Sequence, residues 1–330
     1  MKVNDINSRD ISFKGFWSNK IVKKGLEFAS DNGALFAATT TLALSTGVRT
    51  LSIFATPKTE KENKKIAAAK SIISGILEFG LTLAISAPIA AAFKKIDKNP
   101  QKYLKSDAIN KLKNNSETLK DSKAYSLATQ LFKLGISFAV VLPKAILTAI
   151  GIPVILDNCF TKSNRNKPLE ENTGISFQGK SSDKLASGLG KILNNESLQN
   201  FAIKHKDSNF PVHIFALKDV FATTAFINQA KKNKKINEEQ KPFLIKNSII
   251  STTLSIISSY TIDKLTDKQA ENIVNKITKE NLNDPKLAKY LEGFKIIKPI
   301  FILAFVYYTI IPIISTFLAQ ISENNTKKVQ

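Results

Sequence analysis

Arg49, Glu78 and Lys144 are charged side chains that lie inside predominantly apolar blocks of the sequence. An ionisable group inside such a block is costly to bury, and within a membrane it commonly marks a ligand or ion pathway. Arg49 and Glu78 lie on consecutive blocks, at similar distances from Asn63 in the polar loop between them, so we expect them to pair. The pair would be either a structural ion pair that fixes the hairpin or part of a functional site. Lys144 is the third candidate for an intramembrane polar site, because the neighbouring Pro143 frees a backbone carbonyl one turn earlier.

Other chemistry has few residues to use. The chain has one cysteine, Cys159, and two histidines, His205 and His213, with no spacing typical of a metal or thiol site. We interpret the string Gly188 to Gly190 as small-residue packing, because it lies in an amphipathic stretch without a phosphate-binding pattern. We therefore expect no catalytic residue, no metal and no cofactor, and we do not expect an enzyme.

Apolar residues are concentrated in blocks that must position these charges. The blocks cover residues 34–56, 71–93, 134–156, 243–262 and 296–319, with a weaker one at 212–230. A soluble helical protein more often distributes such residues as stripes at helical spacing. The blocks at 71–93 and 296–319 are long enough to cross a hydrocarbon layer of about 30 Å. The sequence predicts an all-α membrane bundle of four to six spans, with helical connectors outside the membrane.

The order of these blocks is the same in two halves of the chain. ISFKG at residues 11–15 returns as ISFQG at 175–179, and the string SIIS occurs at Ser71 and at Ser248. A Lys-rich loop precedes each SIIS, and an Ile-Pro pair ends the third block of each half. Because all of these similarities keep the same order, we predict an internal repeat. If each half holds three spans, we expect inverted halves with a site between them, as in many transporters.

Five segments follow from this pattern. We expect an N-terminal amphipathic segment at 1–33, a first helical half at 34–156, a linker at 157–180, a second helical half at 181–320 and a polar tail at 321–330. Asn-Lys-Pro and a low apolar content mark the linker. Asn99-Pro100 and Asp284-Pro285 predict helix starts within the connectors, because each offers a capping side chain before a proline.

The formal net charge is +21, and it comes almost entirely from lysine. Lysines in loops attract anionic lipid headgroups, each by about 1 kcal/mol close to the surface, so we expect a lipid membrane as partner. Nucleic acid is disfavoured because the chain has only three arginines and its basic runs lack aromatic residues. Residues 16–30 predict a helix at the membrane surface. Its candidate interfacial anchors are Trp17, Lys20, Lys23 and Lys24.

These observations favour a multi-pass protein of the cell membrane. One hypothesis is a transporter or channel-like protein that handles a small molecule or an ion near Arg49, Glu78 and Lys144. The alternatives are a non-catalytic membrane scaffold whose basic loops bind lipid, and a soluble α-helical interaction protein. The positive-inside rule slightly favours four spans with both termini cytoplasmic. Neither the substrate nor the oligomeric state follows from the sequence.

Overall fold

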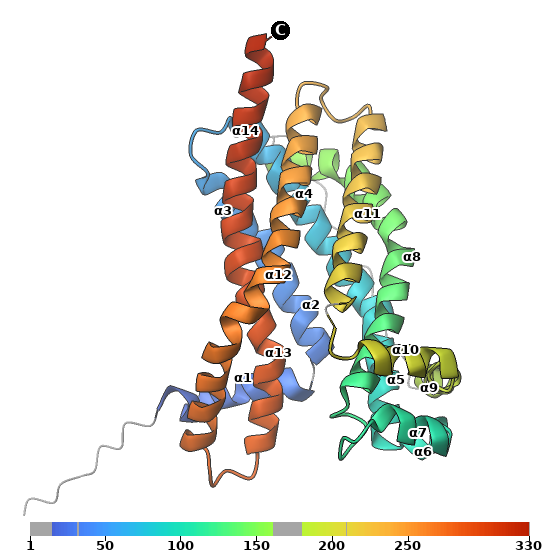
Figure 1. Ribbon diagram of the computed structural model, residues 1–330. Coiled ribbons are helices and arrows are strands. Elements are labelled where there is room, and N and C mark those ends of the chain that lie inside the picture. The colour runs from blue at the N-terminus through green and yellow to red at the C-terminus, as the bar shows by residue number, and fades with distance from the viewer. Residues whose placement is uncertain (1–14, 32, 161–179, 209, 330) are drawn as a thin grey trace, which may run out of the picture.

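The computed structural model describes residues 15–31, 33–160, 180–208 and 210–329, and this part contains helices and no strand (Figure 1). The prediction of an all-α fold is confirmed. Residues 11–14 and 175–179, which carry the opening strings of the expected repeat, lie outside the described residues, so the repeat itself stays a prediction.

Six long helical segments build the bundle. In the first half these are α2 (Gly33–Ala43), joined to α3 (Arg49–Ala55) by the π-helical turn η2 (Leu44–Val48); α4 (Lys61–Leu81), joined to α5 (Ala87–Lys98) by η3 (Thr82–Ser86); and α8 (Lys123–Ile155), which ends in η4 (Leu156–Phe160). In the second half they are α11 (Phe210–Lys232), α12 (Lys241–Glu280), and α13 (Leu287–Phe305), joined to α14 (Ile311–Val329) by η5 (Val306–Ile310).

The long helices match the apolar blocks but extend well past them. Helix α12 includes the polar stretch after Thr266 that we expected to be a separate connector helix, because no glycine or internal proline interrupts it. Helix α14 likewise continues through residues 321–329, the expected polar tail. Two helical stretches of the described residues, Lys61–Lys98 and Phe138–Phe160, are long and apolar enough to cross a membrane.

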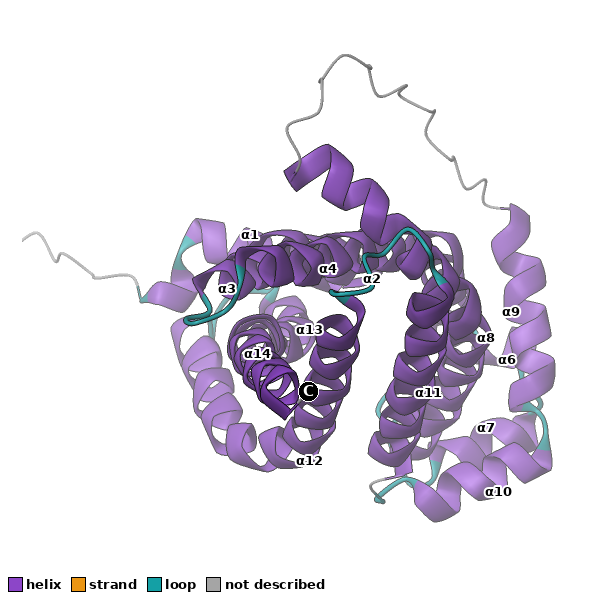
Figure 2. Ribbon diagram, turned by 90° about the horizontal axis from the view of Figure 1, so that it is seen from above, coloured by secondary structure: helices purple, strands orange, loops and turns teal. Residues whose placement is uncertain are grey.

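The six segments form a closed ring, which Figure 2 shows from above. Around the ring, α3 contacts α4, α4 contacts α8, α8 contacts α11, α11 contacts α12, α12 contacts α14, and α14 contacts α3. Each half therefore places its first long segment against the last long segment of the other half. The two halves complete one bundle instead of forming two separate ones.

The two halves run in the same direction. Lys123 at the start of α8 pairs with Asp207 just before α11, at 2.7 Å. At their other ends, the Asn233 amide just after α11 donates to the Ala149 carbonyl of α8, also at 2.7 Å. Helices α8 and α11 are therefore parallel neighbours (Figure 1). The inverted arrangement that we expected for three long segments per half is wrong, because the third segment of one half and the first of the next point the same way.

Short helices cover one end of this bundle. They are α1 (Lys20–Asp31), preceded by the 3-10 turn η1 (Phe16–Ser18), and the connectors α6 (Pro100–Tyr103), α7 (Ser106–Lys113), α9 (Lys180–Leu193) and α10 (Glu196–His205). The connectors are helical, as predicted, and α6 begins at Pro100. The Asp284 carboxylate accepts a hydrogen bond from the Lys286 backbone at 2.9 Å, but α13 begins at Leu287, two residues after the predicted start at Pro285.

Three apolar clusters hold the elements together. The largest lies between the halves and joins α3, α4, α8, α11, α12 and α14. Its small residues, among them Ala67, Ala68 and Ala149, let the long helices approach closely. Gly75 of α4 shows the same need, since a side chain there would collide with Ser45. The second cluster joins the connectors to α5 and α8, and the third joins α1 to α12 and α13.

Candidate functional site: a polar cavity between the two halves

A cavity of about 460 Å³ lies inside the ring. All six long segments contribute to its lining, so it is shared by the two halves. Most of its lining residues are polar, although an apolar core cluster lies beside it. Its charged lining residues are Arg49, Lys70, Glu78, Lys144 and Asp219.

The two carboxylates of the cavity each have a lysine partner. Glu78 of α4 forms an ion pair with Lys144 of α8. Asp219 of α11 lies 3.4 Å from the ammonium of Lys218, its neighbour in the chain. These pairs neutralise both acids of the lining.

Arg49 and Lys70 have no acidic partner within the described residues. The Arg49 guanidinium donates one hydrogen bond, to the Ser251 hydroxyl at 3.2 Å. The Lys70 ammonium donates to the Ser248 hydroxyl at 2.6 Å and lies 4.3 Å from the centre of the Phe226 ring. A guanidinium has five N–H donors and an ammonium three, so most of their donors remain free for a bound group. The cavity therefore carries an excess of positive charge.

Hydroxyl groups surround the two cations. Serines and threonines of five different long segments line the cavity, and the Thr223 and Thr252 hydroxyls lie 2.6 Å apart across α11 and α12. A hydroxyl can turn to donate or to accept, so this lining can adapt to a bound oxyanion. The wide turns η2 and η5 contact each other beside the cavity and place Arg49 and Tyr308 on its wall. Such π-helical turns occur frequently at functional sites.

The three candidate residues of the polar site line this one cavity, but their pairing differs from our prediction. Glu78 pairs with Lys144, and no ion pair joins it to Arg49. The prediction placed the turn of the hairpin at Asn63, whereas α3 ends at Ala55 and α4 begins at Lys61. Measured from these helix ends, Arg49 and Glu78 differ in depth by roughly 16 Å, at a rise of about 1.5 Å per residue. Pairing is therefore excluded by the position of the turn.

Lys70 is the site residue that the sequence analysis missed. It was counted with the basic loop at residues 57–70, although it lies well inside α4 and at nearly the depth of Arg49. The predicted repeat offered a signal. Lys70 and Asn247 each directly precede the shared string SIIS, and both line the cavity.

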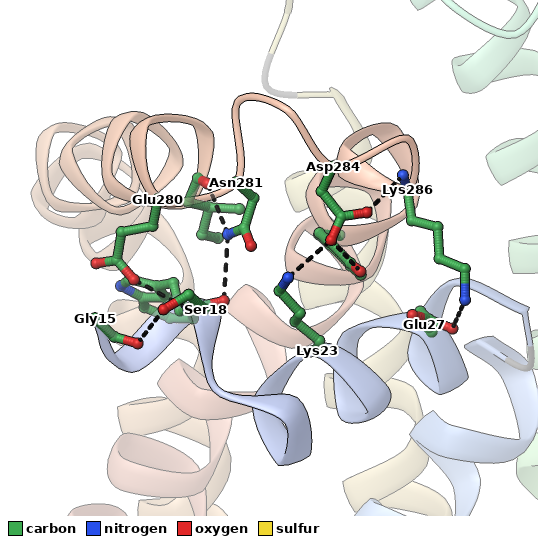
Figure 3. Close-up of polar contacts among 11 residues, drawn as sticks. Gly15, Ser18, Lys23, Glu27, Glu280, Asn281, Asp284 and Lys286 are labelled. Atoms are coloured by element: carbon green, nitrogen blue, oxygen red, sulfur yellow. Dashed lines mark hydrogen bonds and ion pairs between the residues drawn. The ribbon is translucent and has the colours of Figure 1, made fainter. Parts of the chain in front are cut away.

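The four expected interfacial anchors divide into two groups. Trp17 packs edge-on against Phe294, so it faces the protein. Lys23 faces the protein as well, because its ammonium pairs with Asp284 at 2.7 Å (Figure 3). Trp17 of η1 and Lys23 of α1 thus contact α13 and the turn before it, and their role at a lipid surface stays a prediction. Lys20 and Lys24 are exposed.

The contact between α1 and the α12–α13 turn shifts the pKa values of two residues, Asp284 and Tyr290. The Lys23 ammonium and the Lys286 backbone N–H lower the pKa of Asp284 to about 2. Burial of the Tyr290 hydroxyl, together with its hydrogen bond to Asp284, raises the pKa of Tyr290 to about 12. The carboxylate therefore remains ionised at neutral pH and holds α1 in place.

The remaining candidates stay apart. Cys159 is exposed in η4, and the His213 ring lies 2.6 Å from the Tyr260 hydroxyl on the outside of the bundle. Among the described residues, no group of three His, Cys, Asp or Glu side chains could hold a metal ion. No protein-family model, no curated protein and no solved structure matches this chain.

Proposed function

We propose that this protein binds a small anionic molecule in the cavity between its halves, and that it acts in a membrane as a transporter or channel-like protein for that anion. The observation that carries the proposal is the pair of cations, Arg49 and Lys70, without a carboxylate partner in a polar cavity. The proposed role is binding, not catalysis.

Electrostatics favours an anion over a cation or a neutral ligand. Two cations that share a cavity repel each other, and each loses part of its hydration there. A bound oxyanion would compensate both charges, and the surrounding hydroxyls would donate to its remaining oxygens. Glu78 and Asp219 do not remove this excess, because Lys144 and Lys218 already neutralise them.

The outer surface supports a membrane location. Every long segment exposes large apolar side chains, whereas soluble monomers rarely expose large contiguous apolar patches. Examples that are between 45% and 70% exposed are Leu51, Ile76, Ile150, Leu217, Ile257 and Phe305. An apolar exterior around a polar interior is the arrangement expected of a solute pathway in a bilayer. The cell membrane, with four to six spans, is therefore our proposed location.

A soluble anion-binding protein is the second candidate, and the parallel halves favour it. Phe160 lies roughly 55 Å along α8 and η4 from Lys123, at about 1.5 Å per residue. Helix α9 begins near the other end of α8, where Asp183 pairs with Lys95 at 3.0 Å. Residues 161–179 must connect these two ends, and they carry five charged side chains. Each Lys or Arg at the centre of a bilayer costs about 2.5 to 3.5 kcal/mol, so this segment is a poor membrane crossing.

Anion binding is tested directly on the purified chain. Titration with inorganic phosphate, sulfate or succinate, each at matched ionic strength, should raise the unfolding temperature in a saturable way, because a ligand of the folded state stabilises it. Sodium chloride at the same ionic strength is the control. A response that follows ionic strength alone, with no difference between the anions and chloride, would contradict the proposed site.

Alkaline carbonate extraction separates the two candidates. If the ring lies in the bilayer, the protein should stay in the membrane pellet after the carbonate wash, because its apolar exterior holds it in the hydrocarbon. Recovery in the supernatant would exclude the membrane location and favour the soluble candidate, while leaving the anion site untouched. A peripheral protein that is followed in the same extract controls for complete washing.

A further inference from the structure

Helix α1 has an inner face that is fully occupied. Leu26 and Ala29 are buried, and Leu26 packs in a cluster with Ile277, Tyr290 and Phe294. A side chain at Gly293 would collide with the Leu26 backbone, so α1 and α13 approach closely. Ion pairs of Lys23 with Asp284, and of Glu27 with Lys286, fix this face (Figure 3).

The outer face of α1 combines apolar and basic residues. Ile21 is 80% exposed, Phe28 is 46% exposed, and Phe16 in the preceding turn is 68% exposed. Lys20 and Lys24 lie on the same side at helical spacing, and neither pairs with an acid in the described part of the chain. Added atoms at Gly25 would meet open space. Among the described residues, Phe28 contacts the Phe36 ring of α2 and Phe16 contacts Trp17, whereas Lys20, Ile21 and Lys24 remain exposed.

The position of α1 suits a surface helix. It lies across the lower end of the bundle, transverse to the long helices (Figure 1). At its C-terminal end, Asp31 pairs with Lys289 at 3.0 Å and accepts a hydrogen bond from Lys94 through its backbone carbonyl. The chain then enters α2, where Leu35 is exposed. Charged residues at the C-terminal end of α1 therefore lie next to the exposed apolar residues at the start of α2.

We propose that the outer face of α1, made of Phe16, Lys20, Ile21, Lys24 and Phe28, binds the headgroup region of an anionic phospholipid bilayer. The apolar side chains enter the boundary of the acyl chains, and the lysines extend toward the phosphates, as in other interfacial helices. This contact is independent of the anion site, and it requires no assumption that the ring spans the bilayer.

Charge and continuity favour lipid over a protein partner. The two free lysines complement negative headgroups, and the whole chain carries a net charge of +21. The exposed apolar residues of α1 also continue into those of α2, so one bilayer surface can contact both. A protein partner would need an acidic rim that matches these lysines, and it would leave position 21 protected in the absence of lipid.

Spin labels on α1 test the contact. In a Cys159→Ser background, nitroxides are attached to Ile21→Cys and, as a matched control, to Leu282→Cys in the α12–α13 turn, which is 70% exposed. The protein is combined with vesicles of phosphatidylcholine and phosphatidylglycerol. We expect the label at position 21 to become accessible to oxygen and protected from a water-soluble nickel chelate, while the label at position 282 stays accessible to the chelate.

The charge requirement is tested by two further comparisons. Vesicles of phosphatidylcholine alone, or the Lys20→Glu/Lys24→Glu variant on anionic vesicles, should reduce the protection at position 21. The Lys184→Glu/Lys191→Glu variant, which changes two exposed lysines of α9, should not. If position 21 remains as accessible to the nickel chelate as position 282 on anionic vesicles, the proposal is wrong. Equal protection on neutral vesicles would overturn the selectivity for anionic lipid.

Discussion

Changing Arg49 and Lys70 together to glutamine should abolish saturable anion binding. Each cation offers a charge-assisted hydrogen bond worth about 1.5 to 3 kcal/mol, so each single change should weaken binding about 10- to 100-fold. Glutamine is shorter than either side chain, but it removes the charge and keeps a hydrogen-bonding group in the cavity. Binding is measured by calorimetry or by the ligand-dependent rise in unfolding temperature, with inorganic phosphate as the probe.

The same variants separate a binding role from a structural one. Without ligand, the two cations repel each other, so their removal should leave the unfolding temperature unchanged or raise it. Lys246→Gln is the matched control, because Lys246 lies on α12 near the site but donates to Ser322 and Thr326 of α14. A large loss of stability in the Arg49 and Lys70 variants, with anion affinity retained, would show that the cations serve the fold.

The sequence predicted the helices better than their arrangement. Blocks of apolar residues locate the long helices, because a stretch of this length and composition can be buried only as a helix or a fully paired strand. Closure of the ring depends instead on contacts between segments far apart in the chain, such as α3 with α14. Periodicity within one segment carries no information on those contacts, nor on the parallel direction of the two halves.

The composition of the site was predictable in part. Arg49, Glu78 and Lys144 stand out because a charge within an apolar block is rare, and all three line the cavity. Their pairing was mispredicted, since it depends on where the chain turns and on the π-helical turns, neither of which a hydrophobic pattern locates. Lys70 was missed because the basic run toward its N-terminus, which resembles a loop in the sequence, forms the first turns of α4. Without the helix boundary at Lys61, it looks like one more loop lysine.

The orientation of α1 illustrates the same limit. Its apolar residues form one wide face, with Val22 and Leu26 toward one edge and Ile21 and Phe28 toward the other. An amphipathic helix was therefore predictable, but the side that docks was not. Contacts with α13 decide which side docks. Gly293 of α13 allows the Leu26 backbone to approach closely, and Asp284 in the turn before α13 pairs with Lys23.

Reversing one charge of the Glu78–Lys144 pair should destabilise the protein strongly, and reversing both should restore it. Glu78→Lys would add a cation to the cavity that already contains Arg49, Lys70 and Lys144, with no added anion to compensate. A broken buried pair costs about 3 to 5 kcal/mol, and since these side chains are 46% and 30% exposed, we expect roughly half of that, about 2 kcal/mol. Glu78→Lys with Lys144→Glu should recover most of the loss, as measured by thermal unfolding.

A comparison of two second substitutions shows which residue pairs with position 78. Glu78→Lys combined with Arg49→Glu restores the same net charge as the combination with Lys144→Glu, but Arg49 lies at a different depth from position 78. If only the combination with Lys144→Glu restores stability, positions 78 and 144 are in direct contact. An effect of net charge alone would restore stability equally in both combinations. Equal rescue would show that the cavity senses net charge without a defined pair. Better rescue by Arg49→Glu would contradict the arrangement of α4 and α8, and would place the turn of the first hairpin near Asn63 after all.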